Sequence, residues 1–154
     1  MVSSLQLIQT MHRFMDIAMH YSMRASGHFT KAMGLSMPQF SILMQLHHRG
    51  ACGMSEVSER FEITPAAASQ LVDKLVQSGL IHREEDPNDR RAKSLKLTDK
   101  GRELIRQGIE DRYRWVEPLA GKLTAEERAK VHEALTIMTE AASQMETALV
   151  QHAA

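Results

Sequence analysis

The stretch from Thr64 to Gly79, TPAAASQLVDKLVQSG, has the composition of a capped amphipathic helix. Thr64 can accept a hydrogen bond from the first free N–H groups of a helix, and Pro65 suits the first helical position. Gly79 favours the left-handed conformation that ends many helices. An apolar stripe runs along one flank at helical spacing, formed by Leu71, Val72, Leu75 and Val76. We therefore expect a helix that buries one flank and presents a small, polar N-terminal end.

The residues after this helix are typical of two strands joined by a basic turn. Residues 79–83 (GLIHR) begin an extended segment, Asp86–Asp89 favours a turn, and Ser94–Leu97 alternates polar and apolar residues. Three cations follow the turn: Arg90, Arg91 and Lys93. This order predicts a winged helix-turn-helix, whose helix enters the DNA major groove while the basic turn reaches the backbone or minor groove.

The residues before Thr64 supply the first half of a helix-turn-helix. Ser36 and Gln39 form a capping box around Pro38, which predicts a helix that ends at Gly50. A shorter helix is expected from Gly53, and residues 62–63 then turn the chain into the Thr64 helix. Two helices joined by a short turn, with the second presented outward, are the helix-turn-helix arrangement. The expected buried residues are Phe40, Leu43, Leu46, Val57 and Phe61.

Long apolar stripes at both ends of the chain predict a homodimer. The N-terminal stripe, which Gly27 interrupts, contains Leu5, Ile8, Met11, Met15, Met19 and Met23. Thr98 is expected to cap a helix that carries Leu104, Ile105, Ile109, Val116 and Leu119. A capping box of Thr124 and Glu127 then opens a heptad pattern at Val131, Leu135, Met138, Ala142, Met145 and Leu149. One protomer has too little core to cover these helices, so intertwining with a second copy is expected.

Composition limits the kind of nucleic-acid binding that is possible. The 154-residue chain has zero formal net charge, and residues 51–100 hold eight Lys or Arg against nine Asp or Glu. A few placed cations, not a broad positive field, would therefore hold DNA. The single cysteine excludes an internal disulfide framework, and the sequence lacks a membrane span and a signal peptide, so we expect a cytoplasmic protein. No motif for an enzyme or for a cofactor is found.

Taken in order, these motifs resemble the MarR family of bacterial transcriptional regulators over essentially the whole chain. The family's wing pattern, Asp-x-Arg followed after five residues by Leu-Thr, is met by Asp89, Arg91, Leu97 and Thr98. One departure is Gly53, where the family usually has a capping Thr or Ser. Further matching stretches are Ser55–Val57, Thr64–Pro65 with Ser69, GLIHR at 79–83 and LTDKG at 97–101.

The resemblance implies a mainly α fold with a small β-wing (α+β) in a single domain, residues 1–154. Residues 36–99 would form the DNA-binding lobe, with the recognition helix at 64–79 and the wing at 80–98. Residues 1–34 and 102–154 would form an intertwined dimerisation region. The family's usual function is that of a homodimeric repressor on a pseudo-palindromic operator, and a small-molecule effector, often a phenolic or lipophilic anion, releases it.

Candidate DNA-binding residues come from both the helix and the wing. Gln70 can bond an adenine edge, although a solvated surface glutamine is the alternative. The resemblance places Arg91 in the minor groove with Asp89 orienting it, and an idle surface ion pair is the alternative. Lys74 could reach a phosphate or remain solvated. Phosphate or thymine-methyl contacts are assigned to Thr64, Pro65, Ala66, Ala67, Ser69, Arg90 and Lys93.

The effector site and two other sensing roles are less defined by the sequence. Helix faces suggest an apolar effector lining of Met15, Met19, Phe40, Met44 and Trp115. His12, Asp16 and His20, beside the methionine stripe, could bind a metal, but a methionine-rich dimer core accounts for the same pattern. Cys52 could sense oxidants, yet a buried structural thiol is favoured. A helical adaptor that binds a protein partner also fits the neutral DNA lobe, and the operator, the regulated genes and the sign of regulation stay open.

Overall fold

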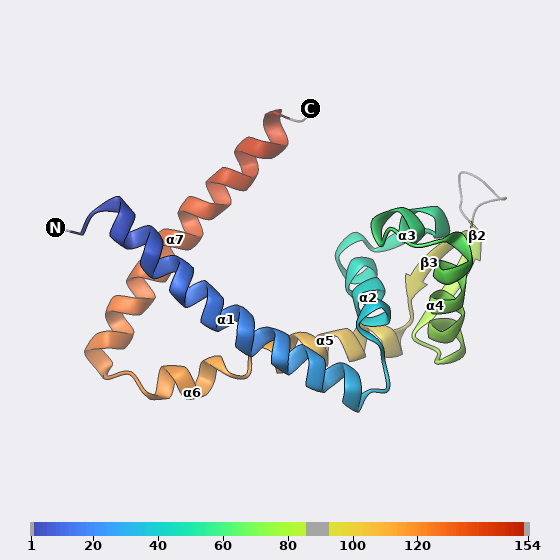
Figure 1. Ribbon diagram of the computed structural model, residues 1–154, viewed down its shortest axis with the longest axis horizontal. Helices are drawn as coiled ribbons and strands as arrows, with labels where there is room; N and C mark the ends of the chain where they lie inside the picture. Colours follow the sequence, from blue (N-terminus) through green and yellow to red (C-terminus); the bar gives the residue numbers. More distant parts are fainter. Residues whose placement is uncertain (1, 86–92, 153–154) are drawn as a thin grey trace. The chain divides into compact units, whose positions relative to one another are not determined.

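The computed structural model describes residues 2–85 and 93–152, and it is mainly helical with a small antiparallel sheet, as predicted. The chain divides into two compact units, Met1–Tyr113 and Arg114–Ala154. In chain order the elements are α1 (Ser4–Ala32), α2 (Met37–Arg49), β1 (Ala51–Gly53), α3 (Met54–Arg60), α4 (Pro65–Gln77), β2 (Ile81–Glu85), β3 (Lys93–Leu97), α5 (Asp99–Tyr113), α6 (Val116–Gly121) and α7 (Ala125–His152) (Figure 1).

The sheet has three strands in the order β1-β3-β2, and all neighbours are antiparallel. The β2–β3 hairpin is the predicted wing, with Ile81 opposite Leu97. The strand β1, which places Cys52 opposite Leu95, was not predicted. Three residues are too few to show the period of two that marks a strand in sequence, so this pairing depends on the tertiary structure.

One core holds the helix-turn-helix, the wing and α5 together. The α2 helix contributes Ile42, Leu43 and Leu46, which are almost completely buried. In Figure 1 α1 runs beside α5 at the end of this core, and the Phe29 ring of α1 meets the Phe40 ring of α2 edge to face at 5.9 Å. Other fully buried side chains come from α3, α4, β3 and α5: Val57, Val72, Leu75, Leu95 and Ile105. The buried flank of α4 is thus held against a rigid support, and its opposite face is left exposed.

The predicted helix starts are confirmed by their capping bonds. Ser36 and Gln39 form the reciprocal capping box of α2, and Gly50 ends this helix with a φ of 81°. Thr98 accepts a hydrogen bond from the Gly101 amide at the start of α5. These bonds join residues three apart, which is why the local sequence predicted them.

Gly27 interrupts the apolar stripe but not the helix itself, since α1 continues to Ala32 and a glycine inside a long helix costs only about 1 kcal/mol. One expectation about helix continuity was wrong. The helix after Thr98 does not reach Leu119, since α5 ends at Tyr113 and α6 begins at Val116. Pro118 explains this break: it lacks the N–H that a continuous helix requires, and it is tolerated in the first turn of a new one.

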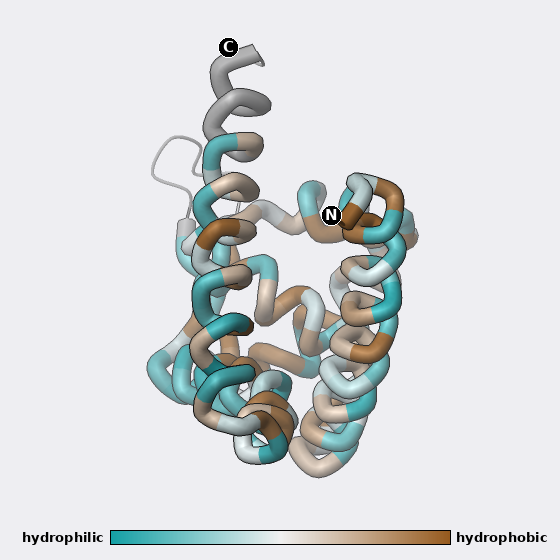
Figure 2. Tube along the Cα trace, turned by 90° about the vertical axis from the view of Figure 1, so that its left-hand side faces the viewer, coloured by the Kyte–Doolittle hydropathy of each residue, from teal (hydrophilic) through white to brown (hydrophobic). Residues whose placement is uncertain are grey.

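The second unit contains α6 and the long helix α7. The predicted capping box opens α7, with the Thr124 amide donating to Glu127 at 2.8 Å and the Glu127 amide donating to the Thr124 hydroxyl at 3.2 Å. Along α7, which leads to the C mark in Figure 2, hydrophobic residues alternate with hydrophilic ones. Within the described residues, no helix combines the length and the hydropathy that crossing a bilayer requires.

Candidate nucleic-acid interface

The α4 helix is fixed by a cap at its start and by one buried flank. The Thr64 hydroxyl accepts a hydrogen bond from the Ala67 amide at 3.2 Å, and Pro65 is the first helical residue. Val72 and Leu75 are completely buried against the core. The direction of the helix is therefore set by the face that does not contact solvent.

The opposite face of α4 carries the predicted DNA-contacting residues. Ala67 and Ser69 are half-buried at its margin. Asp73, the one carboxylate on this helix, is paired with Arg83 of β2 at 2.5 Å. This ion pair removes the main source of repulsion toward phosphate and ties α4 to the wing, so the role of Arg83 is structural. The exposed residues of the set are Thr64, Pro65, Ala66, Gln70 and Lys74.

Only the two strands of the wing, β2 and β3, lie within the described residues. Asp89, Arg90 and Arg91 lie outside the described residues, and Lys93 begins β3. On the described strands, Glu84 accepts hydrogen bonds from Lys96 at 2.6 Å and from His82 at 2.8 Å. These bonds, the one from Lys96 first, lower the pKa of the Glu84 carboxyl. Because Lys96 is already paired with a carboxylate, it is a poor candidate for binding phosphate.

The base of the wing is tied to the end of α4 and the start of α5. The Thr98 amide donates to the Leu80 carbonyl at 3.0 Å, and the Thr98 hydroxyl donates to the Gly79 carbonyl at 2.7 Å. Gly101 lies so close to the residue before β2 that an added Cβ would be 2.1 Å from the Leu80 carbonyl oxygen. Sequence reasoning noted Gly101 as part of a motif but missed this contact, which only a glycine allows.

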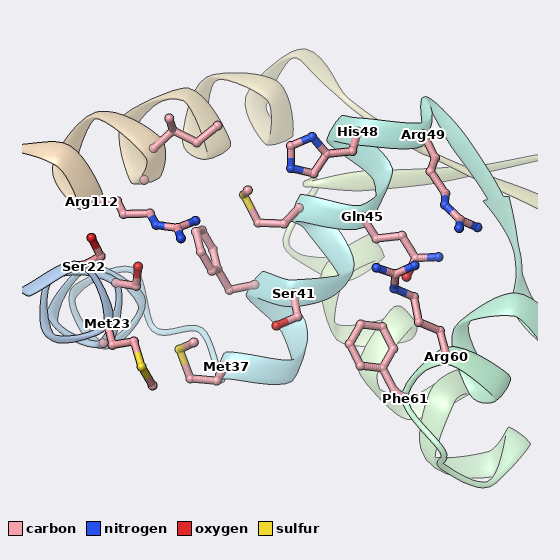
Figure 3. A pocket seen from close by; sticks show the side chains of 16 residues that line it. Ser22, Met23, Met37, Ser41, Gln45, His48, Arg49, Arg60, Phe61 and Arg112 are labelled. Carbon is pink, nitrogen blue, oxygen red and sulfur yellow. The ribbon is translucent and has the colours of Figure 1, made fainter. Parts of the chain in front are cut away.

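A cavity of about 630 Å³ lies within the first unit, between α1, α2, α3 and α5 (Figure 3). Phe40 and Met44, two of the predicted effector residues, line it. Met15 and Met19 are exposed on α1 and are not among the lining residues, and Trp115 belongs to the second unit. The predicted effector residues are thus only partly brought together.

Sequence reasoning missed the polar residues of this cavity. Gln45, Arg49, Arg60 and Arg112 all line it, together with His48. They come from three helices, and no spacing in the sequence relates them. Among these residues only Gln45 could have been noticed in the sequence, because it is a polar residue within the apolar stretch of α2.

The structure does not support a sensing chemistry at the single cysteine. Cys52 is buried in β1, and burial, helped by the nearby Glu56 carboxylate, raises the pKa of its thiol to about 11. A thiol in that state is a poor nucleophile at neutral pH. Within residues 2–85 and 93–152, no three His, Cys, Asp or Glu side chains gather as metal ligands, and His12, Asp16 and His20 are all exposed on α1.

A helix-turn-helix with an exposed second helix, followed by an antiparallel wing, defines a winged helix-turn-helix DNA-binding regulator. The model of the MarR family matches residues 35–93, which span this lobe. The helix-turn-helix and the wing are thus similar to those of the MarR family, and the chain is a DNA-binding transcriptional regulator. Its relatives and fold neighbours are transcriptional regulators and not enzymes.

Three comparisons illustrate the relationship. The HTH-type transcriptional regulator YfiV of Bacillus subtilis is 28% identical over 109 residues, which cover 71% of this chain and 68% of YfiV. The HTH-type transcriptional repressor MdtR of Bacillus subtilis is 38% identical over 68 residues, 44% of each chain. The crystal structure of the transcriptional regulator Tm0710 from Thermotoga maritima superposes with a TM-score of 0.81 at 26% identity, covering 88% of this chain and 96% of Tm0710.

Proposed function

We propose that the protein is a homodimeric repressor that binds a pseudo-palindromic operator and leaves it when a small phenolic or lipophilic anion binds. The observation that carries this proposal is the exposed, small and polar N-terminal half of α4, whose only carboxylate is neutralised by Arg83. A helix of this kind can approach base edges closely, because little side-chain bulk and no free negative charge stand in the way.

The predicted DNA-contacting residues of α4 have distinct roles in this docking. Gln70 would bond an adenine edge, which is worth about 1–3 kcal/mol of base discrimination. Pro65, Ala66 and Ala67 would contact thymine methyl groups. Thr64, Ser69 and Lys74 would bind phosphates and so fix the register without reading the sequence.

The wing would extend the contact beyond the major groove. Arg91 would enter the flanking minor groove, with Asp89 orienting its guanidinium. Arg90 and Lys93 would bind phosphates beside it. Since Lys96 is held by Glu84, the affinity of the wing for DNA would depend on these few residues.

Apolar residues exposed on both long helices support a dimer. On α1 they include Leu5, Ile8, Met15 and Met19. On α7 they include Val131, Leu135, Met138 and Met145. A second copy that covered both faces would remove this surface from water and would set two α4 helices about 34 Å apart, one turn of DNA.

The cavity supports control by a small molecule. Its walls belong to α2 and α5, which also pack against the DNA-binding elements, so a ligand there can favour one spacing of the two α4 helices over another. Such a ligand acts only through its different affinity for the two spacings. The assignment as a repressor is supported by the likeness to MdtR, whose name describes a repressor.

Fluorescence anisotropy with DNA from immediately upstream of the gene tests the proposal. We expect saturable binding of two protomers per site, with an affinity that falls steeply as salt is added, because bound phosphates release counterions. Gln70→Ala should relax the sequence preference, whereas Gln77→Ala, at the far end of α4, should not. Arg91→Ala should weaken binding, with Arg106→Ala on α5 as the matched control.

Two results would count against this function. The docking model is wrong if Gln70→Ala and Arg91→Ala both leave affinity and sequence preference unchanged. If a well-folded dimer fails to bind this and other upstream DNA at low salt, a protein partner becomes the better explanation of the neutral DNA lobe.

A further inference from the structure

Gln45 is a buried polar side chain without a hydrogen-bond partner. It lies in the middle of α2, is only 5% exposed and lines the cavity. Neither its Nε2 nor its Oε1 atom has a partner in the described part of the chain. Buried carboxamides are nearly always bonded, so one that is left unpaired beside a cavity requires an explanation. A ligand that supplies the missing hydrogen-bond partners would explain it, and the chemistry of Gln45 then predicts which groups that ligand carries.

The cavity is also positively charged. Its lining includes the guanidinium groups of Arg49, Arg60 and Arg112 and contains no Asp or Glu. Arg112 is half-buried, and its guanidinium lies 5.6 Å from the centroid of the Tyr113 ring. Figure 3 shows Arg112 entering from α5 at one side, well separated from Gln45 on α2. An anionic group and a second polar group of one ligand could thus be bound at different ends.

The remaining lining is apolar and adaptable. Three methionines and two aromatic rings contribute, and thioether side chains adjust to ligands of irregular shape. The volume of about 630 Å³ lies within the usual range for small-molecule sites. The apolar lining residues are Met23, Met37, Phe40, Met44, Phe61 and Ile109.

We propose that this cavity binds an organic carboxylate with an apolar, ring-containing body that carries a primary carboxamide or lactam group at its other end. The carboxylate pairs with Arg112, and the amide pairs with Gln45. A primary carboxamide or a lactam presents an N–H and a C=O side by side, so it can form two parallel hydrogen bonds with the Gln45 carboxamide. The inference rests on the proposed function, since it names the chemical class of the effector.

Binding requires a small rearrangement at Gln45. Both of its polar atoms are screened from solvent, so the side chain must rotate for its carboxamide to meet the ligand. Met44, its neighbour in the lining, has three rotatable bonds and can move with it. The rotation replaces two unpaired groups with two hydrogen bonds, so the side-chain packing on this face of α2 differs between the ligand-bound and the free protein.

Three naphthalene probes separate the contributions. The first is 6-carbamoyl-2-naphthoate, which has both groups. The second is 6-acetyl-2-naphthoate, which keeps the charge and the shape but replaces the amide nitrogen with a methyl group. The third is methyl 6-carbamoyl-2-naphthoate, which keeps the amide but lacks the charge. Affinity is measured by calorimetry on the full-length protein without DNA.

We expect the first probe to bind about tenfold more tightly than either of the others. The acetyl probe lacks the amide N–H that would bond Gln45, and the methyl ester lacks the carboxylate that would pair with Arg112. Gln45→Leu should abolish the preference over the acetyl probe, while Gln107→Leu on the surface of α5 should keep it. Arg112→Gln should weaken the two carboxylates about tenfold and leave the methyl ester unchanged, with Arg106→Gln as its control.

Equal affinity of the first two probes for the wild-type protein would overturn the inference, as would a preference that survives Gln45→Leu. A failure of all three probes to bind at millimolar concentration would overturn it too. Operator anisotropy, run in parallel, distinguishes the two hypotheses. If the probes bind with the expected preference but do not release DNA, the inference stands and the proposed effector response fails. If another compound releases DNA and the probes do not bind, the proposed function stands and the inference fails.

Discussion

Replacement of Gly101 by alanine tests how the wing is joined to α5. Gly101 lies in the first turn of α5, and its amide donates to the Thr98 hydroxyl. A Cβ there would lie 2.1 Å from the Leu80 carbonyl oxygen, whereas real Cβ contacts are almost never shorter than 3.0 Å. The start of α5 must therefore move by about 0.9 Å, the difference between these two distances, away from the wing.

Two opposing effects decide whether Gly101→Ala raises or lowers the free energy of unfolding. Alanine favours a helix over glycine by at most about 1 kcal/mol. Overpacking costs about 1–3 kcal/mol, and the hydrogen bond from the Thr98 amide to the same Leu80 oxygen, about 0.5–1.5 kcal/mol, is strained or lost. The clash is with backbone, which cannot turn aside as a flexible side chain can, so we expect a net loss of about 2 kcal/mol.

Urea unfolding at a fixed protomer concentration measures this loss, with Gly27→Ala as the matched control. Gly27 also lies in a helix, but a Cβ there meets nothing within 4 Å, so alanine should stabilise the protein by up to about 1 kcal/mol. Gly101→Ala should also weaken operator binding, because the wing shifts with Leu80. Gly101→Ala that is as stable as the wild type, or more stable, would refute the close approach of α5 to Leu80.

Three further outcomes follow from the described residues. Gln45→Leu should raise the free energy of unfolding by about 1–3 kcal/mol, because it removes unpaired buried polar atoms, and a loss of stability in urea titrations would mean that Gln45 has an internal partner. Thr64→Ala should lower stability by about 1 kcal/mol and weaken operator binding, since the cap of α4 is lost; Thr10→Ala, on the exposed face of α1, serves as control. The thiol of Cys52 should react with iodoacetamide at pH 8 at least about a hundredfold more slowly in the native than in the urea-unfolded protein, since its pKa rises from 9.0 to about 11; rates within a few-fold of each other would contradict its burial. Because the pKa of Cys52 is higher in the folded than in the unfolded protein, its thiol ionises at lower pH in the unfolded chain. The contribution of the protonated Cys52 thiol to stability is therefore complete below pH 9 and disappears as the pH rises through about 11.

The wing and the recognition helix show how far local signals extend. The start of α4, its left-handed end at Gly79 and the wing strands were all predictable, because each depends on residues close in sequence. The strand β1 was not, because its three residues are extended only by pairing with β3, more than forty residues later. The break before α6 had a local signal in Pro118, which was overlooked.

The candidate effector site shows where such signals end. Phe40 and Met44 were found from the buried face of α2, but Gln45 and Arg112 were not, because their meeting at one cavity requires four helices to pack. The partner of Asp73 could not be predicted either, since Arg83 reaches it only after β2 folds back on α4.

The sequence by itself determined the helix caps, the order of helix, strand, turn and strand, and the family that the chain resembles. Hydrogen bonds between residues three or four apart and apolar stripes at helical spacing are properties of a local segment, so they are present before the chain folds. The tertiary structure alone decided which carboxylate neutralises the DNA-facing helix, why residue 101 must be glycine, and which polar groups share the cavity. These depend on distances between segments far apart in the chain, and only the packing of the common core sets those distances.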